Sequence, residues 1–320
     1  MATVSGQLKD ANINGKPRDL SDLIFNIAPT DTPFMTMCGK ADASQTLHEW
    51  QTETLAAPAA NSVLEGADVS SYSEQTTTEL TNKTQILTKA ISVSGTAQAV
   101  KQNGVGKQYA HQAALAMKML KKDVEYALLS NQLARTESGA DTRLMRGLPT
   151  WFETNTSVGT NGAKADPTNS AACVNGTTRV PTEAMVKDLL TDVYEAGGNP
   201  DTIMMAPEIR VKMSSVLGAS NTKMENVEKK KATSVIDVYV SDFGTLKLVP
   251  NRVQAYVTYS KDCAFVLDPD YWKVAYLRGF SEQKLAVTGD SVKGQLLVEC
   301  TLEARNEASS GMLADLKVSS

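Results

Sequence analysis

One stretch in the first half of the chain has the hydrophobic spacing of a long helix. Its apolar positions recur about every 3.6 residues: Val105, Tyr109, Ala113, Ala116, Leu120, Val124, Ala127 and Leu128. Gly104 and Gly106 weaken the first turns, so we expect firm helix from Lys107 to Ala134, roughly 42 Å at 1.5 Å per residue. The charged positions are expected to face mostly elsewhere: Lys118, Lys121, Lys122 and Glu125.

Residues 44–96 have a different pattern, dominated by Ser, Thr, Gln, Glu and Ala. Strand-like runs at 46–53 and 84–95 flank a middle with Pro58, Asn61 and Gly66, which predicts a long two-stranded ribbon. Such a ribbon has too little apolar surface to be stable alone. We therefore expect it to lie against its own chain or against a neighbouring copy.

The N-terminal segment is expected to hold an arm and short helices. Residues 1–20 are polar and contain helix breakers, which favours an extended arm. Residues 19–27 begin with capping side chains and then show helical spacing up to Pro29. A second short helix can start at Pro33, because proline is tolerated in a first turn.

The second half alternates helices and strands. Residues 153–181 form a surface loop with hairpin signals, and Thr182 caps a helix that ends at Gly197. A short buried strand at 202–206 and a helix from Pro207 follow, and further strands are expected within 233–248 and 262–305. This order indicates a mixed domain of helices and strands.

The composition mainly excludes some classes of protein. The 320 residues include 32 Lys and Arg against 36 Asp and Glu, so the surface as a whole cannot act as a polycation. A hydrophobic content of 42% is that of a folded protein. No apolar run approaches the roughly 18 residues of a membrane span, so no membrane partner is expected.

No catalytic, cofactor-binding or metal-binding site is expected. The four cysteines lie far apart without a CxxC pair, which disfavours a disulfide framework or a zinc site. Of the two histidines, His48 neighbours Glu49 on a predicted strand, where adjacent side chains point to opposite faces. His111, on the predicted long helix, is expected to have a structural role or to face solvent. The run Asn103–Lys107 lacks the spacing of a phosphate loop.

Several short motifs, in order along the chain, resemble one family. They are the runs 18–24 (RDLSDLI), 27–34 (IAPTDTPF), 48–53 (HEWQTE), 288–291 (TGDS), 299–303 (ECTLE) and 306–307 (NE). Together they resemble tailed-bacteriophage major capsid proteins of the Hong Kong 97-type fold. The resemblance covers nearly the whole chain.

The resemblance implies an α+β fold in five segments. They are an N-terminal arm (1–43), an extended two-stranded E-loop (44–96), a peripheral domain with the spine helix and a variable loop (97–181), an axial domain (182–260), and returning peripheral strands with the C-terminus (261–320). The ribbon and the long helix predicted above fall where this layout needs them.

The function implied by the resemblance is assembly rather than catalysis. Copies would form hexamers and pentamers of an icosahedral shell around double-stranded DNA, which they would contact weakly. Portal, scaffold or decoration proteins are further partners of such shells. The chain would then lie in the virion, and in the host cytoplasm during assembly.

Contacts between copies are expected at the E-loop and the arm. Large apolar side chains of the ribbon are the expected anchors: Trp50, Leu55, Leu64 and Tyr72. Arg18, Glu53 and Glu65 are expected to fix the register between copies.

Two other functions remain open on the sequence. An encapsulin-like cellular shell of the same fold would enclose cargo proteins instead of DNA. A soluble α/β enzyme would need a deep pocket, and it would leave the ribbon and the arm disordered.

Overall fold

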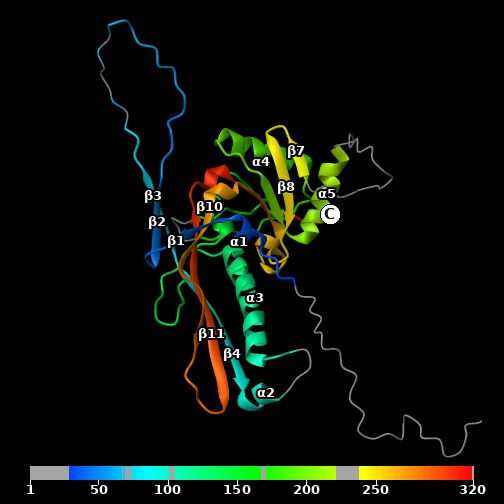
Figure 1. The fold of residues 1–320 in the computed structure, drawn as a ribbon. Helices are drawn as coiled ribbons and strands as arrows, with labels where there is room; N and C mark the ends of the chain where they lie inside the picture. The colour runs from blue at the N-terminus through cyan, green and yellow to red at the C-terminus, as the bar shows by residue number, and fades with distance from the viewer. Residues whose placement is uncertain are drawn as a thin grey trace, which may run out of the picture.

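The computed structural model describes residues 29–66, 68, 72, 74–100, 105–166, 171–220 and 238–318. It contains a four-stranded sheet with a long helix, a six-stranded sheet with two further helices, and a two-stranded ribbon that projects from the body (Figure 1). The helix predicted at 19–27 and the candidate residue Arg18 lie outside the described residues.

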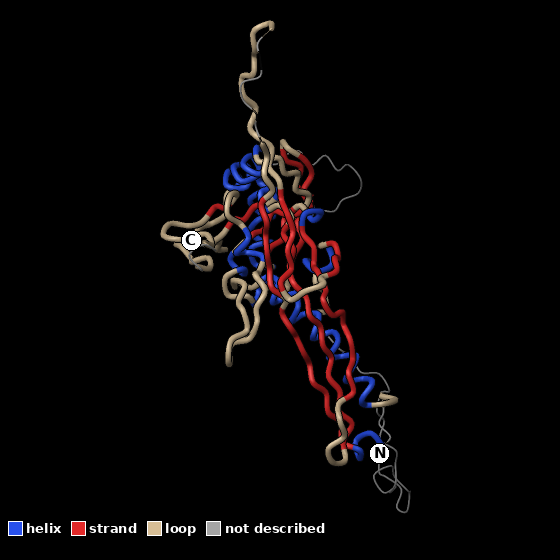
Figure 2. Tube along the Cα trace, turned by 90° about the vertical axis from the view of Figure 1, so that its left-hand side faces the viewer, coloured by secondary structure: helices blue, strands red, loops and turns tan. Residues whose placement is uncertain are grey.

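The four-stranded sheet forms the elongated part of the molecule. Its order is β1 (Gly39–Asp42), β10 (Trp272–Lys284), β11 (Ser291–Ala304) and β4 (Gln85–Ser94). β11 pairs antiparallel with both β10 and β4, whereas β1 runs parallel to β10. The three long strands run side by side down the molecule in Figure 2.

Helix α3 (Gln108–Leu129) lies along one face of this sheet (Figure 1). Its buried Leu120, Val124 and Leu128 belong to one hydrophobic core with side chains of β4 and β11, which include Ile91 and Val298. The predicted stripe is therefore confirmed. The helix is shorter than predicted, 22 residues or about 33 Å, because Ser130 adopts an extended backbone and ends it.

The six-stranded sheet makes up the other part of the body. Its strands, in order across the sheet, are β5 (Thr156–Ser157), β12 (Gly311–Leu313), β9 (Ala264–Leu267), β6 (Thr202–Met205), β8 (Gly244–Pro250) and β7 (Val238–Ser241). Helices α4 (Glu183–Glu195) and α5 (Pro207–Ser220) pack on it through a second core that contains Val186, Leu189 and Met213.

Local signals in this half are confirmed. The Thr182 hydroxyl accepts a hydrogen bond from the Met185 amide and caps α4. Gly197 follows that helix with φ of +91°, a conformation that glycine adopts without strain. All four residues of β6 are buried. The loop after Phe152 contains a hairpin contact between Ala163 and Val174.

The remaining elements are short. Helix α1 (Pro33–Met37) begins at the predicted proline, and α2 (Gly95–Ala99) follows β4. Single 3₁₀ turns connect the longer elements: η2 (Leu148–Trp151), η3 (Gln254–Tyr256), η4 (Ser260–Asp262), η5 (Pro269–Tyr271) and η6 (Glu307–Ser309). Among the helices of the described segments, none is both long and apolar enough to cross a membrane.

The ribbon pairs differently from the prediction. Strand β2 (Leu47–Thr52) pairs with β3 (Thr78–Lys83), and not with residues 84–95. The latter run is β4 of the body sheet, where Ile91 and Val93 are buried under α3. The physical reason is burial: alternating apolar residues are more stable in a covered sheet, while the Thr-rich run at 78–82 can form the less buried ribbon.

Candidate assembly surface

The root of the ribbon is fastened to the body by a buried asparagine. Asn82, opposite His48 in the ribbon, is fully buried. Its side-chain amide donates to the Leu302 carbonyl at 2.7 Å, and its Oδ1 accepts from the Arg146 amide at 2.8 Å. One side chain thus joins the ribbon both to β11 and to the loop that follows α3.

Trp50 holds the other strand of the root. Its indole N–H donates to the Ala304 carbonyl at 2.8 Å, and its ring centroid lies 5.5 Å from that of Trp151. The half-buried Trp50 therefore packs against its own chain, although the sequence suggested contact with a neighbouring copy. The Trp50 indole N–H is thus used within its own subunit, in keeping with the general preference of a buried indole N–H for an acceptor.

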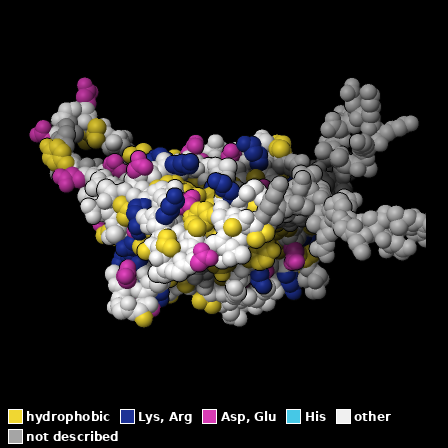
Figure 3. Space-filling view, turned by 60° about the horizontal axis from the view of Figure 1, so that its bottom comes forward, with side chains coloured by type: hydrophobic (Ala, Val, Ile, Leu, Met, Phe, Trp, Pro, Cys, Tyr) yellow, Lys and Arg dark blue, Asp and Glu magenta, His cyan; other side chains and the backbone are white. Residues whose placement is uncertain are grey.

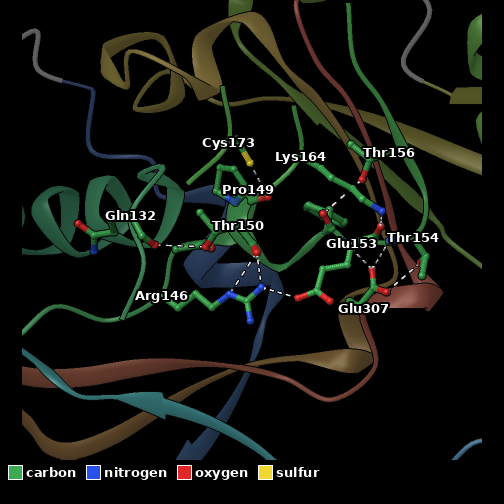
Figure 4. Close-up of polar contacts among 12 residues, drawn as sticks. Gln132, Arg146, Pro149, Thr150, Glu153, Thr154, Thr156, Lys164, Cys173 and Glu307 are labelled. Carbon is green, nitrogen blue, oxygen red and sulfur yellow. Dashed lines mark hydrogen bonds and ion pairs between the residues drawn. The ribbon is translucent and has the colours of Figure 1, made fainter. Parts of the chain in front are cut away.

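Figure 4 shows the polar contacts around Arg146, Thr150 and Glu153, in the segment that contains Trp151. The Arg146 guanidinium lies 4.0 Å above the Trp151 ring centre, donates to the Thr150 carbonyl from Nε at 3.1 Å, and pairs with Glu153 at 2.8 Å. Burial lowers the pKa of Arg146, and the nearby Glu153 opposes that shift. Glu307 accepts from the Thr154 hydroxyl at 2.8 Å, which ties this turn to the C-terminal segment.

A buried carboxylate lies where the ribbon strand β3 passes into β4. Glu299, on β11, accepts from the Thr84 hydroxyl at 2.8 Å and from Arg278 Nε at 2.7 Å, and it also pairs with Arg143. The Thr84 amide donates to the Thr46 carbonyl, so this joint closes the ribbon root. Two arginines neutralise one buried carboxylate, which is the condition for burying such a charge.

A second carboxylate, Glu303, fixes the root from the side of β2. His48 Nε2 lies 3.0 Å from Glu303 Oε2, and Arg305 Nε donates to Oε1 at 2.8 Å. Burial alone would raise the pKa of Glu303, but the hydrogen bonds from Arg305 and His48 outweigh it and hold the pKa below its usual value. His48 thus finds its carboxylate partner on β11, and not at the adjacent Glu49.

Beyond the root, the ribbon exposes large apolar side chains. Leu55, Leu64 and Tyr72 are 90%, 84% and 86% exposed, and Val63 is 81% exposed. Residues 53–64 form no helix or strand. Side chains of this kind gain little from the folding of their own subunit, and a group of them marks a candidate contact with another molecule.

The charged side chains of the ribbon between residues 53 and 82 are all acidic. Between residues 53 and 82 the sequence has five acidic side chains, Glu53 and Glu65 among them, and no Lys or Arg. Figure 3 shows acidic and hydrophobic side chains on the projecting ribbon, whereas the body carries both charge signs. The surface that the ribbon contacts should therefore be apolar and basic.

Sequence reasoning placed one acid of the long helix on the wrong face. Glu125 on α3 was expected to face away from the stripe, but it is fully buried. It accepts from the amides of Phe34 and Met35 at 2.8 Å each and from Asn251 Nδ2 at 2.7 Å. Burial raises the pKa of Glu125, while these three hydrogen bonds oppose the rise. Its position directly after Val124 of the apolar stripe was the available signal.

In the segments that the structure describes, no group of three or more His, Cys, Asp or Glu side chains could hold a metal ion. The four cysteines are buried free thiols. The carboxylates and arginines of the clusters described above are engaged in internal hydrogen bonds and ion pairs, which suits positioning of the ribbon.

Comparison with known proteins identifies the family. A family model described as "SU10 major capsid protein" matches residues 3–317. The chain belongs to the SU10 major capsid protein family. It is a major capsid protein of a phage and thus a structural component of the virion, as the sequence motifs suggested.

One curated relative of this capsid protein is the "Major capsid protein" of Escherichia phage Phieco32. The two chains are 28% identical, and the match covers 94% of each. The relative and the family model agree on a structural role, and this family is not one of enzymes.

Solved structures show the same fold. A chain from Mycobacterium phage Adephagia superposes with a TM-score of 0.64 at 13% identity, over 98% of this chain and 99% of that one. The SrpI encapsulin from Synechococcus elongatus PCC 7942 gives 0.57 at 12% identity, over 98% of each chain. At identities this low, the structural similarity establishes only the fold. This is the mixed helix-and-strand fold of Hong Kong 97-type capsid proteins. The family match favours the phage capsid over the encapsulin alternative.

Proposed function

We propose that copies of this chain form hexamers and pentamers that close into an icosahedral head around double-stranded DNA. The observation that carries the proposal is the ribbon: a rigidly fastened root and a tip whose leucines and tyrosine are almost fully exposed. A monomeric protein gains nothing from such a projection, whereas a shell subunit needs a long contact with its neighbour.

The elements of the chain map onto the parts of such a subunit. Residues 47–83 are the E-loop, and α3 is the spine helix. The four-stranded sheet forms the peripheral domain, and the six-stranded sheet with α4 and α5 forms the axial domain. Compared with the boundaries expected from the sequence, the E-loop is shorter because β4 belongs to the peripheral sheet.

Contact between ribbon and neighbour provides a large part of the assembly energy in this proposal. Fully burying one large apolar side chain stabilises by about 1.5–3 kcal/mol. Leu55, Leu64 and Tyr72 are present in every copy, so the burial of these three side chains adds up over the whole shell. The shell is then stable although the area of each single contact is small. The net charge of −4 suits weak contact with packaged DNA, since a strongly basic lining would hold the genome against ejection.

Electron microscopy tests the proposal directly. The purified protein is concentrated at moderate salt, with and without the other proteins of a phage lysate, and its mass is followed by light scattering. We expect closed shells, or rings of five and six copies, with DNA inside particles from infected cells. A stable monomer under every condition contradicts the proposal, and shells filled with cargo protein would favour an encapsulin.

A further inference from the structure

The loop that follows Phe152 carries two asparagine–glycine pairs, Asn161–Gly162 and Asn175–Gly176. An asparagine followed by glycine deamidates readily, because glycine has no side chain to hinder attack by its own backbone nitrogen. Both asparagines are exposed to water, which is the second reactant. The sequence of this loop alone would therefore predict rapid chemical damage at two positions.

Deamidation is an attack within the pair. The glycine nitrogen loses its proton to a base in the solvent and forms a bond with Cγ of the asparagine, while the bond from Cγ to the side-chain nitrogen breaks and ammonia leaves. Water then opens the resulting cyclic imide to an aspartate, or to an isoaspartate whose backbone runs through the former side chain. The net change consumes water, releases ammonium and adds a carboxylate to the chain.

A buried carboxylate holds the proton that this attack must remove. Asp315 is 3% exposed, and its Oδ1 accepts from the Gly176 amide at 2.8 Å. Its other oxygen, Oδ2, accepts from the Gly159 amide at 2.8 Å. The Gly162 amide donates to the Gly159 carbonyl at 2.9 Å, so the attacking nitrogens of both pairs are engaged in hydrogen bonds.

The packing around Asp315 explains why glycine follows each asparagine. A Cβ atom on Gly176 would lie 2.6 Å from the Gly162 nitrogen, and one on Gly162 would lie 2.8 Å from Asp315 Oδ2. A Cβ atom on Gly159 would collide with the Thr177 carbonyl oxygen. Because no larger residue fits at these positions, the reactive sequence is built into the site, and protection has to come from the structure.

We propose that Asp315 protects Asn175 from deamidation. The hydrogen bond from the Gly176 nitrogen to a charged acceptor must break before that nitrogen can turn toward Cγ. Loss of its proton would also place a negative charge beside a buried carboxylate, and like charges repel strongly where water is excluded. Asn161 is protected less, since a neutral carbonyl holds the Gly162 amide.

Protection at this position preserves a joint between the loop and the C-terminal segment. Asp315 follows β12, and the Arg179 amide donates to its backbone carbonyl at 2.7 Å. A new carboxylate at position 175 would lie next to the amide that Asp315 binds, and an isoaspartate would lengthen the backbone there by one carbon. Either product should weaken the joint, and such damage accumulates in a virion because its subunits are not replaced.

Peptide mapping by mass spectrometry tests the proposal on the full chain. The folded protein and two short synthetic peptides, which contain the sequences around Asn161 and Asn175, are kept in the same mildly alkaline buffer. Asn175 should deamidate about tenfold or more slowly in the protein than in its peptide, as expected for an added hydrogen bond to a charged group. Equal rates in protein and peptide overturn the proposal.

A variant of the carboxylate separates its effect from that of folding in general. Asp315→Ala should raise the rate at Asn175 about tenfold or more and the rate at Asn161 by a smaller factor. A lower rate at Asn175 in D315A would show that the carboxylate assists removal of the proton, and it would overturn the proposal. So would an equal acceleration at both asparagines in a folded variant.

The matched control is D262N. Asp262 is partly buried, and its backbone carbonyl accepts from the amide that follows Asp315, but its carboxylate is not the acceptor of the glycine amides described above. D262N should leave the rate at Asn175 unchanged, and a rise equal to that in D315A would overturn the specific role of Asp315. If D315A fails to fold, the comparison of the unaltered protein with its peptide still decides.

Discussion

At the scale of single residues, buried carboxylates organise the parts of this capsid protein. Glu125 binds the start of α1 to α3, Glu299 closes the joint between ribbon and sheet, and Glu303 holds β2. Each is almost fully enclosed and has several donors around it. A buried carboxylate of this kind stabilises only while its donors are in place, so these acids make the arrangement specific.

Replacing Glu125 should loosen α1. Glu125→Leu leaves the amides of Phe34 and Met35 and the Asn251 side chain without their acceptor, so we expect the free energy of unfolding to fall by about 3 kcal/mol or more. Glu125→Gln retains one acceptor oxygen and should cost less, about 1 kcal/mol. Denaturant unfolding gives both values, and hydrogen exchange at Phe34 and Met35 reports whether α1 itself is released. Equal stability of E125L and the unaltered protein would contradict this role.

Glu303 should make the ribbon root sensitive to acid. Its pKa is lowered in the folded chain, so its stabilising contribution is present above the ordinary value of 4.5 and is lost as the pH falls through the lower folded value. We expect Trp50 fluorescence to report release of the root in that acidic range. In Glu303→Gln this acid transition should be largely absent, while the root is already weaker at neutral pH. An unchanged acid transition in E303Q would assign it to other groups.

At the scale of elements, the ribbon consists of two parts, a paired root and a tip, which differ in their contacts. The paired root, β2 and β3, is tied to the body by Asn82 and Trp50. The described residues of the tip at 53–64 lie in no helix or strand, and the large apolar side chains among them face solvent. A stiff root sets the direction in which the tip projects (Figure 1), so that a small apolar tip can reach a distant partner.

Trp50 is the side chain whose loss should release this element. Trp50→Ala removes the hydrogen bond to Ala304 and the ring contact with Trp151, and it should destabilise the root by roughly 2–4 kcal/mol. Faster hydrogen exchange in residues 47–52 and 78–83, with little change in α4 and α5, is the expected result. Trp50→Phe keeps an aromatic ring but has no hydrogen-bond donor. Its hydrogen-exchange rates in the root should lie between those of the unaltered protein and those of W50A. Uniform acceleration over all elements would mean that Trp50 supports the core and not the ribbon alone.

At the scale of the whole molecule, stability and assembly reside in different surfaces. The two hydrophobic cores lie under the sheets, whereas the largest exposures of apolar side chains lie on the ribbon. Substitutions at the tip should therefore leave the subunit intact and affect only contacts between copies.

The triple variant L55S/L64S/Y72S tests this separation. Because these side chains are exposed in the subunit, the free energy of unfolding should change by less than about 0.5 kcal/mol per site. Shell yield, measured by light scattering and microscopy, should fall strongly, since the apolar contact is lost in every copy. Val211→Ser is the matched control, an apolar side chain of α5 that is 71% exposed. Equal loss of assembly in the control would remove the special role of the tip.

Local sequence patterns were sufficient to predict several elements and the family. The stripe of α3, the cap of α4 at Thr182, the buried β6 and the proline start of α1 all depend on residues close together in the chain. The ordered motifs were sufficient to indicate a phage capsid protein. Exposed leucines in a polar ribbon could likewise be recognised, because nothing nearby in the sequence could cover them.

The pairing of the strands and the burial of particular polar residues depend on contacts between distant parts of the chain. Residues 78–83 and 85–94 are both strand formers, and the choice between them depended on the space under α3 for Ile91 and Val93. Trp50 was expected at a contact between copies because large aromatic side chains are common interface anchors, and its acceptor, Ala304, lies 254 residues away in the sequence. Glu299 becomes stable inside the protein only through donors from distant segments, among them Arg143 and Arg278, and this long-range compensation leaves no local pattern to detect.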